Sequence, residues 1–320
     1  MENATTRRPL LIEIDGRPGE GPRDELLRGL RSTQPWIAPK HFYDRLGSRL
    51  FEAICELPEY YLPRAEREIM DAHGAEIAAA VGPGCTLIDL GAGNCEKAER
   101  LFALLQPAQY VAVDISAEFL REKLECLQDR HPRLEIIGLG QDFSRRLVLP
   151  PSVSSRKRLF FYPGSSIGNF PPQEAKEFIS RIQVLCGNDG KLLVGVDLVK
   201  EKATLEPAYD DALGVTAAFN LNVLNNVNRI LGSNFDVRDW RHVAFFNEHE
   251  SRIEMHLEAK KEISVLLPDG PRVFRAGERI HTENSYKASE AALSHTAGPY
   301  GRIRRFWFDS EKRFAVALAN

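Results

Sequence analysis

The chain has 320 residues, 43% of them hydrophobic, which is enough to bury a sizeable core in about two domains. Its formal net charge is −3 at pH 7 and it has no basic block, which argues against nucleic-acid binding. No apolar run is long enough to span a membrane, and no signal-peptide pattern is seen, so we expect a cytoplasmic protein with no membrane partner.

The cysteines favour a reducing compartment and no zinc site. All 5 are dispersed, and none stands in a Cys-x-x-Cys spacing. Cys95 lies beside a glycine-rich turn, but no histidine or basic partner typical of an activated thiol stands out beside it. We therefore predict a small packed residue there, and we expect no metal.

The N-terminal part changes character near Pro39. Residues 1–35 are polar and contain one short apolar run, Leu10–Ile14, which predicts a weakly held arm. Tyr43 and the tyrosine pair that includes Tyr60 follow. Such tyrosines usually pack at an interface with the hydroxyl at a wet edge, and a binding role is the alternative.

The stretch from Thr86 to Glu96 predicts a ligand site. Thr86–Leu90 is an apolar run typical of a buried strand, Gly91 and Gly93 break it, and a helical pattern begins near Glu96. A strand, a glycine turn and a helix N-terminus present backbone N–H groups at the carboxyl edge of a sheet, where nucleotide-like ligands bind.

Asp114 ends the next predicted strand, where a carboxylate can accept hydrogen bonds from two ribose hydroxyls. A dinucleotide fingerprint needs a third glycine, and position 96 is Glu. A ligand with a ribose and no phosphate fits better, which favours S-adenosylmethionine over a nicotinamide cofactor.

Strand and helix patterns alternate through the middle of the chain, which predicts a parallel sheet with right-handed crossovers. The predicted strands are about 86–90, 109–113, 134–138, 158–162 and 191–197, and the predicted helices are about 65–81, 96–106, 116–129 and 172–186.

Two further loops follow predicted strands. Asp142 and Phe143 can hold and sandwich an adenine, or they can be a turn carboxylate and a core ring. In the next loop, Gly164 and Gly168 expose backbone N–H groups and Asn169 adds an amide, which suits an anionic group such as a carboxylate.

A long helix over 206–231 is predicted next, followed by strand-like segments that do not continue the parallel sheet. These segments are about 243–247, 252–259, 262–266 and 279–285. A helix over 286–297 and two strands over 302–308 and 313–319 then predict a terminal reversed hairpin.

A parallel sheet that ends in such a hairpin is the layout of class I (Rossmann-like) S-adenosylmethionine-dependent methyltransferases. We predict this α/β fold with an inserted α+β substrate-binding domain. The cofactor domain is predicted to comprise 62–200 and 284–320, and the substrate-binding domain 1–61 and 201–283.

With these stretches in view, the chain resembles the histidine Nα-methyltransferases of ergothioneine biosynthesis from about Lys40 to its end. The motifs that carry the resemblance are Phe42–Asp44, Leu57–Tyr61, Asp89–Gly93 with Glu96 and Lys97, Gly164–Asn169, Ala208–Ala212, Gly214–Asn220, Ile253–Met255 and Thr282–Ser285. The family often has serine where this chain has Ala92, and a small side chain suffices there.

The resemblance implies three transfers of a methyl group from S-adenosylmethionine to the α-amino group of L-histidine, with S-adenosylhomocysteine as by-product. It implies cofactor contacts at Gly91, Lys97, Asp114, Asp142 and Phe143, beside Gly93 of the same turn. It implies a clamp for the substrate's carboxylate and amine at Tyr60, Gly164, Asn169 and Tyr209, with Tyr43 near the amine, so that Tyr43, Asn169 and Tyr209 serve catalysis. It implies an imidazole pocket at Met255, Glu283 and Ser285.

Several alternatives stay open. The substrate can be another amino acid, such as tryptophan or a modified histidine, and the chain can be a non-catalytic sensor of S-adenosylmethionine. A nicotinamide oxidoreductase is disfavoured by Glu96 and the terminal hairpin. By pattern alone, Met255 is a one-sided strand core residue and Glu283 an exposed strand residue. We expect a monomer, with His41, His242, His249, His256 and His281 as surface or packing residues.

Overall fold

The computed structural model describes residues 7–14, 21–294 and 303–320 and divides the chain into two compact units. The sheet unit comprises Met1–Asp15, Leu62–Leu198 and Ala288–Asn320. The insert unit comprises Gly16–Tyr61 and Val199–Lys287. Each unit is described by itself below.

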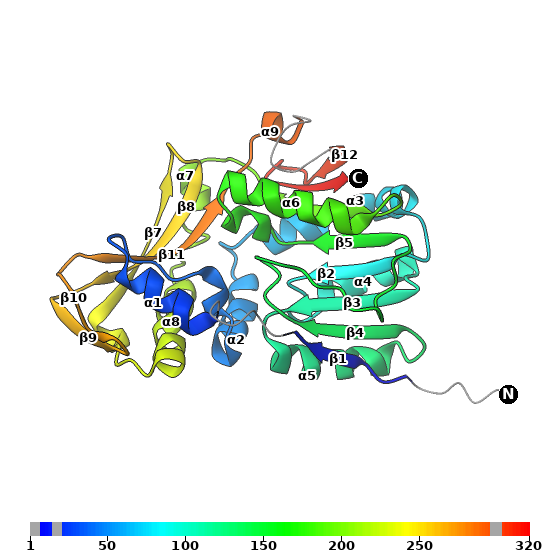
Figure 1. Ribbon diagram of the computed structural model, residues 1–320. Coiled ribbons are helices and arrows are strands. Elements are labelled where there is room, and N and C mark those ends of the chain that lie inside the picture. Colours follow the sequence, from blue (N-terminus) through cyan, green and yellow to red (C-terminus); the bar gives the residue numbers. More distant parts are fainter. Residues whose placement is uncertain (1–6, 15–20, 295–302) are drawn as a thin grey trace. The chain divides into compact units, whose positions relative to one another are not determined.

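The sheet unit is built on one 8-stranded sheet (Figure 1). Its strands, in spatial order, are β1 (Leu10–Glu13), β4 (Glu135–Gly140), β3 (Gln109–Asp114), β2 (Thr86–Leu90), β5 (Arg158–Tyr162), β6 (Lys191–Asp197), β13 (Phe314–Ala319) and β12 (Ile303–Phe308). Neighbours from β1 to β6 pair in parallel, and β13 is antiparallel to both β6 and β12. This order, with a reversed β13 inside the edge strand, confirms the predicted class I methyltransferase fold.

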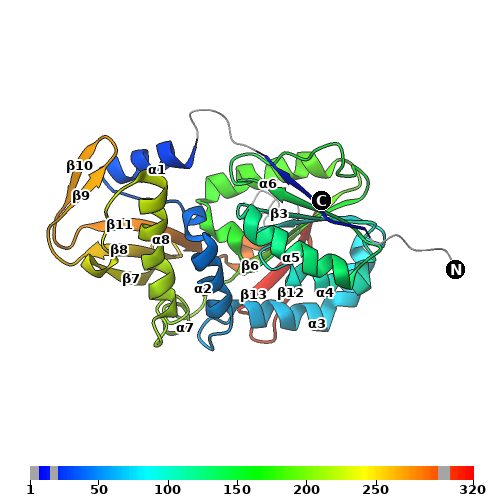
Figure 2. The ribbon, with the colours of Figure 1, turned by 90° about the horizontal axis from the view of Figure 1, so that it is seen from below.

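Helices cover both faces of this sheet, which explains why its strands are near-continuous apolar runs. Helix α6 (Pro172–Cys186) lies on one face, and α3 (Leu62–Val81), α4 (Glu96–Leu105) and α5 (Ala117–Arg130) lie on the other (Figure 2). Phe178 of α6 belongs to one hydrophobic cluster with strand residues. The 3-10 helix η2 (Ser166–Asn169) follows β5, and the short helix α9 (Glu290–Ser294) precedes the terminal hairpin.

The insert unit combines helices with two small antiparallel sheets. Its elements are α1 (Pro22–Arg31), η1 (Pro39–Phe42), α2 (Arg45–Cys55), α7 (Lys202–Leu205), α8 (Val215–Leu231), η3 (Val237–Asp239), β7 (Trp240–Asn247), β8 (Arg252–Ala259), β9 (Ile263–Leu267), β10 (Gly270–Phe274) and β11 (Arg279–Tyr286). One sheet has the order β11-β8-β7, and β9 and β10 form a hairpin.

The prediction of a weakly held N-terminal arm is wrong in two places. Leu10–Glu13, placed with the substrate domain by the sequence pattern, forms β1 and pairs in parallel with β4 of the sheet unit. Pro22–Arg31 forms α1, in which Leu26 and Leu30 are buried. Both segments are short, so their apolar residues give little periodicity to read from the sequence.

The prediction of one long helix over 206–231 is also wrong, because a non-helical segment separates α7 from α8 and α8 begins only at Val215. Gly214 has φ 75°, a left-handed conformation that glycine adopts without strain. The Asp211 carboxylate accepts hydrogen bonds from the N–H groups of Val215 and Thr216 and so starts α8 there. These hydrogen bonds occupy N–H groups of the first turn of α8, so α8 starts as a separate helix.

The helix predicted over 286–297 begins too early. Tyr286 ends β11, and Ala288 forms a bridge with Leu198 and donates its N–H to the carbonyl of Asp197. Only Glu290–Ser294 is helical, and residues 295–297 of the prediction lie outside the described residues.

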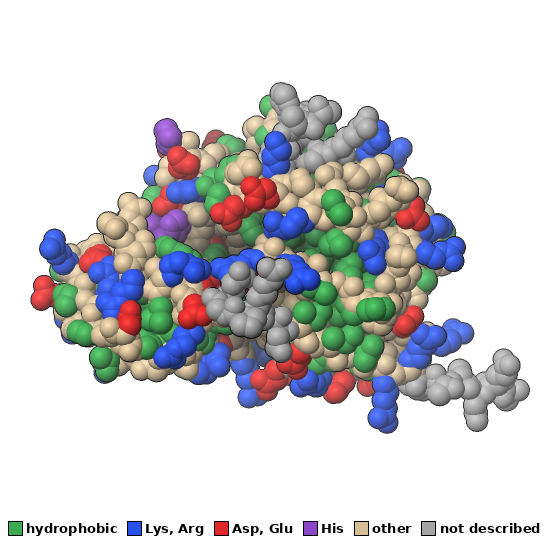
Figure 3. All heavy atoms as spheres, viewed as in Figure 1, with side chains coloured by type: hydrophobic (Ala, Val, Ile, Leu, Met, Phe, Trp, Pro, Cys, Tyr) green, Lys and Arg blue, Asp and Glu red, His purple; other side chains and the backbone are tan. Residues whose placement is uncertain are grey.

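Both signs of charge are interspersed over the face seen in Figure 3, in keeping with the net charge of −3. Among the described residues, no helix is both long enough and apolar enough to cross a lipid bilayer.

Candidate active site

The turn after β2 in the sheet unit has the geometry of a nucleoside site. Gly91 and Gly93 have φ of 73° and 52°, and a Cβ placed on Gly93 would meet no atom within 4 Å. The Asp114 carboxylate accepts from the N–H of Gly93 at 2.9 Å and from that of Ser116 at 3.0 Å. Its free lone pairs can accept from hydroxyls of a ligand, so open space and a carboxylate acceptor fit the ribose of S-adenosylmethionine.

Asp114 and Cys95 are both affected by burial, in different ways. Burial raises the pKa of Asp114, and the N–H groups of Ser116 and Gly93 oppose that rise. Cys95 is 1% exposed, and burial raises the pKa of its thiol well above the ordinary value. The prediction that Cys95 is a packed residue is confirmed.

Glu66 of α3 is a residue of this region that the sequence did not single out. Its Oε2 lies 2.6 Å from Nζ of Lys97, and its Oε1 accepts from the N–H of Gly164 at 2.9 Å. Glu66 therefore ties the start of α4 to the loop after β5, two segments predicted to bind cofactor and substrate. A Cβ on Gly195 would lie 2.7 Å from Oε1 of Glu66, so only glycine at that position leaves room for the carboxylate.

Asp142 and Phe143 follow β4, as predicted. Asp142 accepts from both the backbone N–H and the hydroxyl of Ser144, which closes a turn. The Phe143 ring packs edge-on against Tyr162, with ring centroids 5.9 Å apart. A Cβ placed on Gly91 would lie 3.9 Å from Cζ of Phe143, so this ring borders the glycine turn. Turn formation and adenine binding are compatible at these residues.

The loop after β5 contains the residues predicted to bind a carboxylate. The expectation that the two glycine N–H groups are exposed is wrong, because Gly164 donates to Glu66 and Gly168 donates to the carbonyl of Ser165. Gly164 and Ser165 have φ of 74° and 63°, and Asn169 ends η2 in a part-buried position. The hydroxyl of Ser165 accepts from the N–H of Asp197 at 2.9 Å and so anchors this loop to the end of β6.

In the insert unit, the predicted tyrosines form one aromatic cluster. The rings of Tyr60 and Tyr209 meet edge-on with centroids 6.0 Å apart, and Tyr43 packs on Phe219 at 5.8 Å. Burial, and then the nearby Tyr209 hydroxyl, raise the pKa of Tyr60 well above its ordinary value. Tyr60 therefore stays protonated and can donate a hydrogen bond, but it is a poor general base.

His242 holds the backbone of Tyr209. Its Nε2 lies 2.9 Å from the Tyr209 carbonyl, and its Nδ1 lies 2.8 Å from the side-chain nitrogen of Asn220. These contacts require Nε2 to carry the proton and Nδ1 to accept. Burial lowers the pKa of His242, which keeps this neutral form.

A β-bulge at Thr282 decides which face of the three-stranded sheet carries Glu283. His281 pairs with His256 of β8, but the next pair is Glu283 with Met255, so Thr282 has no partner in the ladder. Because side chains alternate along a strand, this extra residue moves Glu283 to the opposite face from His281. The Thr282 hydroxyl donates to the Met255 carbonyl at 3.0 Å and secures the bulge.

The bulge places the predicted imidazole-pocket residues on one face. Glu283 and Met255 are directly opposed, and Ser285 follows two residues after Glu283. Met255 and Ser285 are buried and Glu283 is part-buried, so the alternative of an exposed strand face is wrong.

Lys287 is a second residue that the sequence did not single out. Its ammonium donates to the Tyr209 hydroxyl at 3.0 Å and to the Ser285 hydroxyl at 2.8 Å, and the two hydroxyls lie 2.8 Å apart. Lys287 could have been found from the sequence, because it stands two residues after Ser285 and four after Glu283, and alternate residues of a strand share a face.

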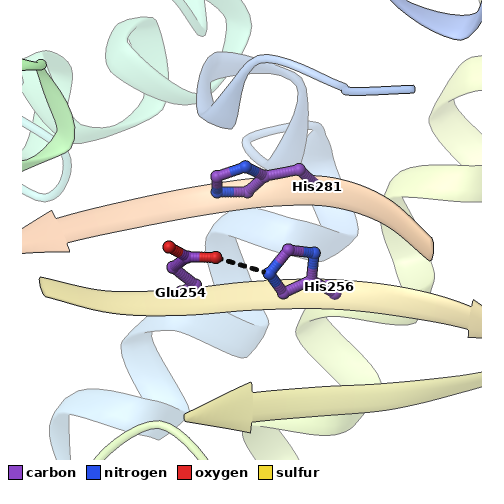
Figure 4. A group of neighbouring side chains, drawn as sticks. All are labelled: Glu254, His256 and His281. Atoms are coloured by element: carbon purple, nitrogen blue, oxygen red, sulfur yellow. Dashed lines mark hydrogen bonds and ion pairs between the residues drawn. The ribbon is translucent and has the colours of Figure 1, made fainter. Parts of the chain in front are cut away.

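The opposite face of the sheet carries Glu254, His256 and His281 (Figure 4). His256 Nε2 lies 2.9 Å from Oε2 of Glu254, and the two histidine rings stack at 4.6 Å. These side chains are of metal-ligand type, but Arg252 already donates to Oε1 of Glu254 at 2.8 Å and balances its charge. Burial lowers the pKa of His256 to about 4, in keeping with a packing residue.

The residues of the predicted substrate clamp belong to both units. Gly164 and Asn169 lie in the sheet unit, and Tyr60 and Tyr209 lie in the insert unit. The structure brings Tyr60 together with Tyr209, and Gly164 together with Asn169. That all four bind one substrate stays a prediction.

The Glu283 carboxyl has its pKa raised to about 7 by burial, and the ammonium of Lys287 opposes this. The folded state therefore binds a proton more tightly than the unfolded chain, and the free energy of unfolding falls as pH rises from about 4.5 to 7. Ionising Glu283 in the folded protein therefore costs stability, which is more typical of a residue at a functional site than of one that only packs.

Replacing Glu283 by Gln should stabilise the protein at about pH 8 by roughly 2 kcal/mol more than at about pH 5, because Gln removes the buried charge. Thermal or denaturant unfolding at the two pH values measures this. Glu262→Gln, at an exposed position of the same unit, should show no such pH dependence. A Glu283→Gln effect that is equal at both pH values would contradict the raised pKa.

Comparison with known proteins agrees with this geometry. Residues 22–320 match the family described as "Histidine-specific methyltransferase, SAM-dependent". The chain is 38% identical over 307 residues to the histidine N-alpha-methyltransferase of Mycolicibacterium smegmatis, with 94% of this chain and 95% of that protein covered. It is 38% identical over 304 residues to the protein of the same name from Mycobacterium tuberculosis, covering 93% and 94%.

A third relative, ergothioneine biosynthesis protein 1 of Neurospora crassa, is 31% identical over 283 residues that cover 86% of this chain and 30% of that protein. The chain belongs to the histidine-specific, S-adenosylmethionine-dependent methyltransferase family.

Proposed function

We propose that this protein methylates the α-amino group of free L-histidine three times and so makes trimethylhistidine (hercynine), the first step of ergothioneine biosynthesis. The observation that carries the proposal is the face of the insert unit on which Met255, Glu283 and Ser285 lie together. Two relatives with 38% identity over nearly their whole length carry the name histidine N-alpha-methyltransferase, which supports the same substrate.

The polar groups of this face suit an imidazole ring. A Glu283 carboxylate would accept the ring N–H, and Met255 would pack against the apolar part of the ring. A buried acceptor left without a donor costs about 1–3 kcal/mol, which disfavours amino acids that have no N–H at that point.

S-adenosylmethionine supplies a methyl group on a sulfonium, and Gly91, Gly93, Lys97, Asp114, Asp142 and Phe143 are the residues proposed to hold it. The amine nitrogen must be unprotonated and in line, so the chain's task is positioning rather than strong acid–base catalysis. We assign this task to Asn169, Tyr43 and Tyr209. Tyr60, which stays protonated, would donate to the substrate carboxylate. Gly164 would border the substrate without donating its N–H, which Glu66 already accepts. The amine proton passes to water before each transfer.

We further propose that the protein acts in the cytoplasm as a monomer, without a metal, a nucleic acid or a membrane partner. All five cysteines are free, which is in keeping with a reducing compartment. Mixed surface charge and a net charge of −3 offer no electrostatic reason for a polyanionic partner.

Incubation of the purified protein with S-adenosylmethionine and each of the standard amino acids, followed by mass spectrometry, tests the proposal. We expect mono-, di- and trimethylated products from histidine alone, because the imidazole N–H can donate to Glu283 while the ring packs beside Met255. Methylation of another amino acid would overturn the substrate. Binding of S-adenosylmethionine without any methylation would favour a sensor.

Glu66→Gln should weaken the affinity for S-adenosylmethionine about fivefold, because a charge-assisted contact to Lys97 becomes a neutral one. Calorimetric titration measures the change in Kd. Asp71→Asn removes an exposed carboxylate from the same helix and serves as the matched control. Equal Kd values for Glu66→Gln and Asp71→Asn would show that Glu66 does not position Lys97.

Deletion of Thr282 should abolish histidine binding and leave S-adenosylmethionine binding intact. Without the extra residue, the two parts of β11 can no longer both keep their side chains on their present faces. Either Glu283 and Ser285 leave the Met255 face, or the residues before the bulge change faces. Thr282→Ser, which keeps the hydroxyl, should bind histidine normally. Retained histidine affinity in the deletion variant would mean that the bulge does not orient the pocket.

A further inference from the structure

Helix α8 of the insert unit has a sequence that local helix propensity does not explain, because asparagine recurs along it. Asparagine side chains compete for backbone hydrogen bonds and are poor helix formers, so a helix that keeps several of them needs a tertiary reason. The asparagines are Asn220, Asn222, Asn225, Asn226 and Asn228. Asn220, Asn222 and Asn226 are no more than 5% exposed, and their amides bond to other parts of the insert unit.

Two of these amides hold the segment that carries Tyr43. Nδ2 of Asn226 donates to the carbonyl of His41 at 2.7 Å, and Nδ2 of Asn222 donates to Oδ1 of Asp44 at 2.9 Å. Tyr43 stands between these two partners, in the turn from η1 to α2, the helix that lies beside α8 (Figure 2). The two asparagines are four residues apart, so they lie on one face of α8 and hold the chain on both sides of Tyr43.

The partners of each amide fix its orientation. Oδ1 of Asn226 accepts from the guanidinium of Arg229 at 2.6 Å, while its Nδ2 faces the His41 carbonyl. A guanidinium can only donate and a carbonyl can only accept, so the reversed amide would lose both bonds. The Asp44 carboxylate also only accepts, which directs the nitrogen of Asn222 toward it. Each amide therefore has one usable orientation.

The turn itself leaves little room for Tyr43 to move. Asp44 also accepts from the N–H of Gly47 at 2.7 Å and so begins α2. A Cβ on Gly47 would collide with the carbonyl oxygen of Phe42, so the chain is too tightly folded here for another residue. Phe219 of α8 packs on the Phe42 ring with centroids 4.6 Å apart and on the Tyr43 ring at 5.8 Å. Helix α8 thus holds both the ring and the flanking backbone.

We propose that Asn222 and Asn226 are positioning residues, which hold Tyr43 in place for methyl transfer and act on the substrate only through it. This inference rests on the proposed function and deepens it, because Tyr43 is one of the residues assigned to orient the amine.

Tyr43 lies within electrostatic range of another proposed substrate residue. Burial raises the pKa of Tyr60 most, and the hydroxyls of Tyr209 and Tyr43 are among the groups that raise it further. The three tyrosines are therefore neighbours within the insert unit. A shift of Tyr43 would change the surroundings of the amine without removing the proposed contacts to the substrate's carboxylate or imidazole.

The third transfer should depend most on this support. In every transfer the lone pair of the amine nitrogen forms the new N–C bond, and the electrons of the S–C bond stay on sulfur. The first two acceptors carry N–H groups, which can donate to neighbouring oxygens and so orient the nitrogen. The third acceptor is a neutral tertiary amine without N–H groups, and its quaternary product has no proton to lose. Only the walls of the site, Tyr43 included, can then aim its lone pair.

The test compares Asn226→Ala with Asn228→Ala in steady-state kinetics of the purified protein. Asn228 is a matched control on the same helix, because its Nδ2 also donates to a backbone carbonyl, that of Phe235 in the segment after α8, at 2.8 Å. Asn226→Ala should lower kcat for histidine about tenfold and change the KM of histidine and of S-adenosylmethionine less than about threefold, because a loosened Tyr43 misdirects a substrate that is still bound. Asn228→Ala should keep kcat within about twofold.

Product composition separates a positioning role from a merely structural one. A loss of folded protein slows all three transfers equally, so the proportions of products at equal turnover stay the same. A loosened Tyr43 slows the third transfer most, so dimethylhistidine should accumulate in Asn226→Ala beyond its level in the unaltered protein at equal turnover. Mass spectrometry of the time course measures these proportions.

A double variant tests whether the effect passes through Tyr43. Once Tyr43→Phe has removed the hydroxyl, adding Asn226→Ala should lower kcat by less than about twofold more, because both changes act on the same group. If Asn226→Ala does not fold, Asn222→Ala loosens the same turn from its other side, and the same kinetic and product changes are expected.

The outcomes separate this inference from the proposed function. Absence of histidine methylation by the unaltered protein would overturn both. With an active protein, any of three results would overturn the role of the asparagines alone. These are equal kcat values for Asn226→Ala and Asn228→Ala, unchanged product proportions, and an undiminished effect of Asn226→Ala in the Tyr43→Phe background. The same three results count against the inference when Asn222→Ala is used.

Discussion

The arrangement of the insert unit depends on one extra residue in a strand. Side chains alternate strictly along β11, so a single insertion at Thr282 changes the face of everything that follows it. Before the bulge, the ring of His281 stacks on that of His256 in a packed cluster. After it, Glu283 lies opposite Met255. One strand thereby supplies a structural cluster to one face and the proposed imidazole pocket to the other.

Each unit has a buried charged residue next to residues that are proposed to contact a ligand. Glu66 is 3% exposed and is satisfied by an ammonium and a backbone N–H. Lys287 is 5% exposed and is shared between two hydroxyls. Desolvating such groups costs several kcal/mol each by order of magnitude, so their hydrogen bonds must be well made. The benefit is rigidity, because a fully satisfied polar network has few alternative arrangements.

The sheet unit follows a simpler constraint. The carboxyl ends of parallel strands lie at the same edge of a sheet. That edge therefore brings together Gly91, Asp114, Phe143 and Gly164, which are far apart in sequence. Left-handed backbone at the two glycines allows the chain to turn sharply there. This is the general reason why α/β folds bind ligands at their carboxyl edge.

Sequence alone determined the alternating strands and helices, the glycine turn, Asp114 and the reversed terminal hairpin, because hydrophobic periodicity and glycine placement are local signals. The family motifs identified the residue types of the site. Only the tertiary structure decided that β1 joins the sheet, that Asp211 divides a predicted helix, and that Glu66 and Lys287 support the two sites. These depend on strand register, capping geometry and contacts distant in sequence, none of which a local pattern encodes.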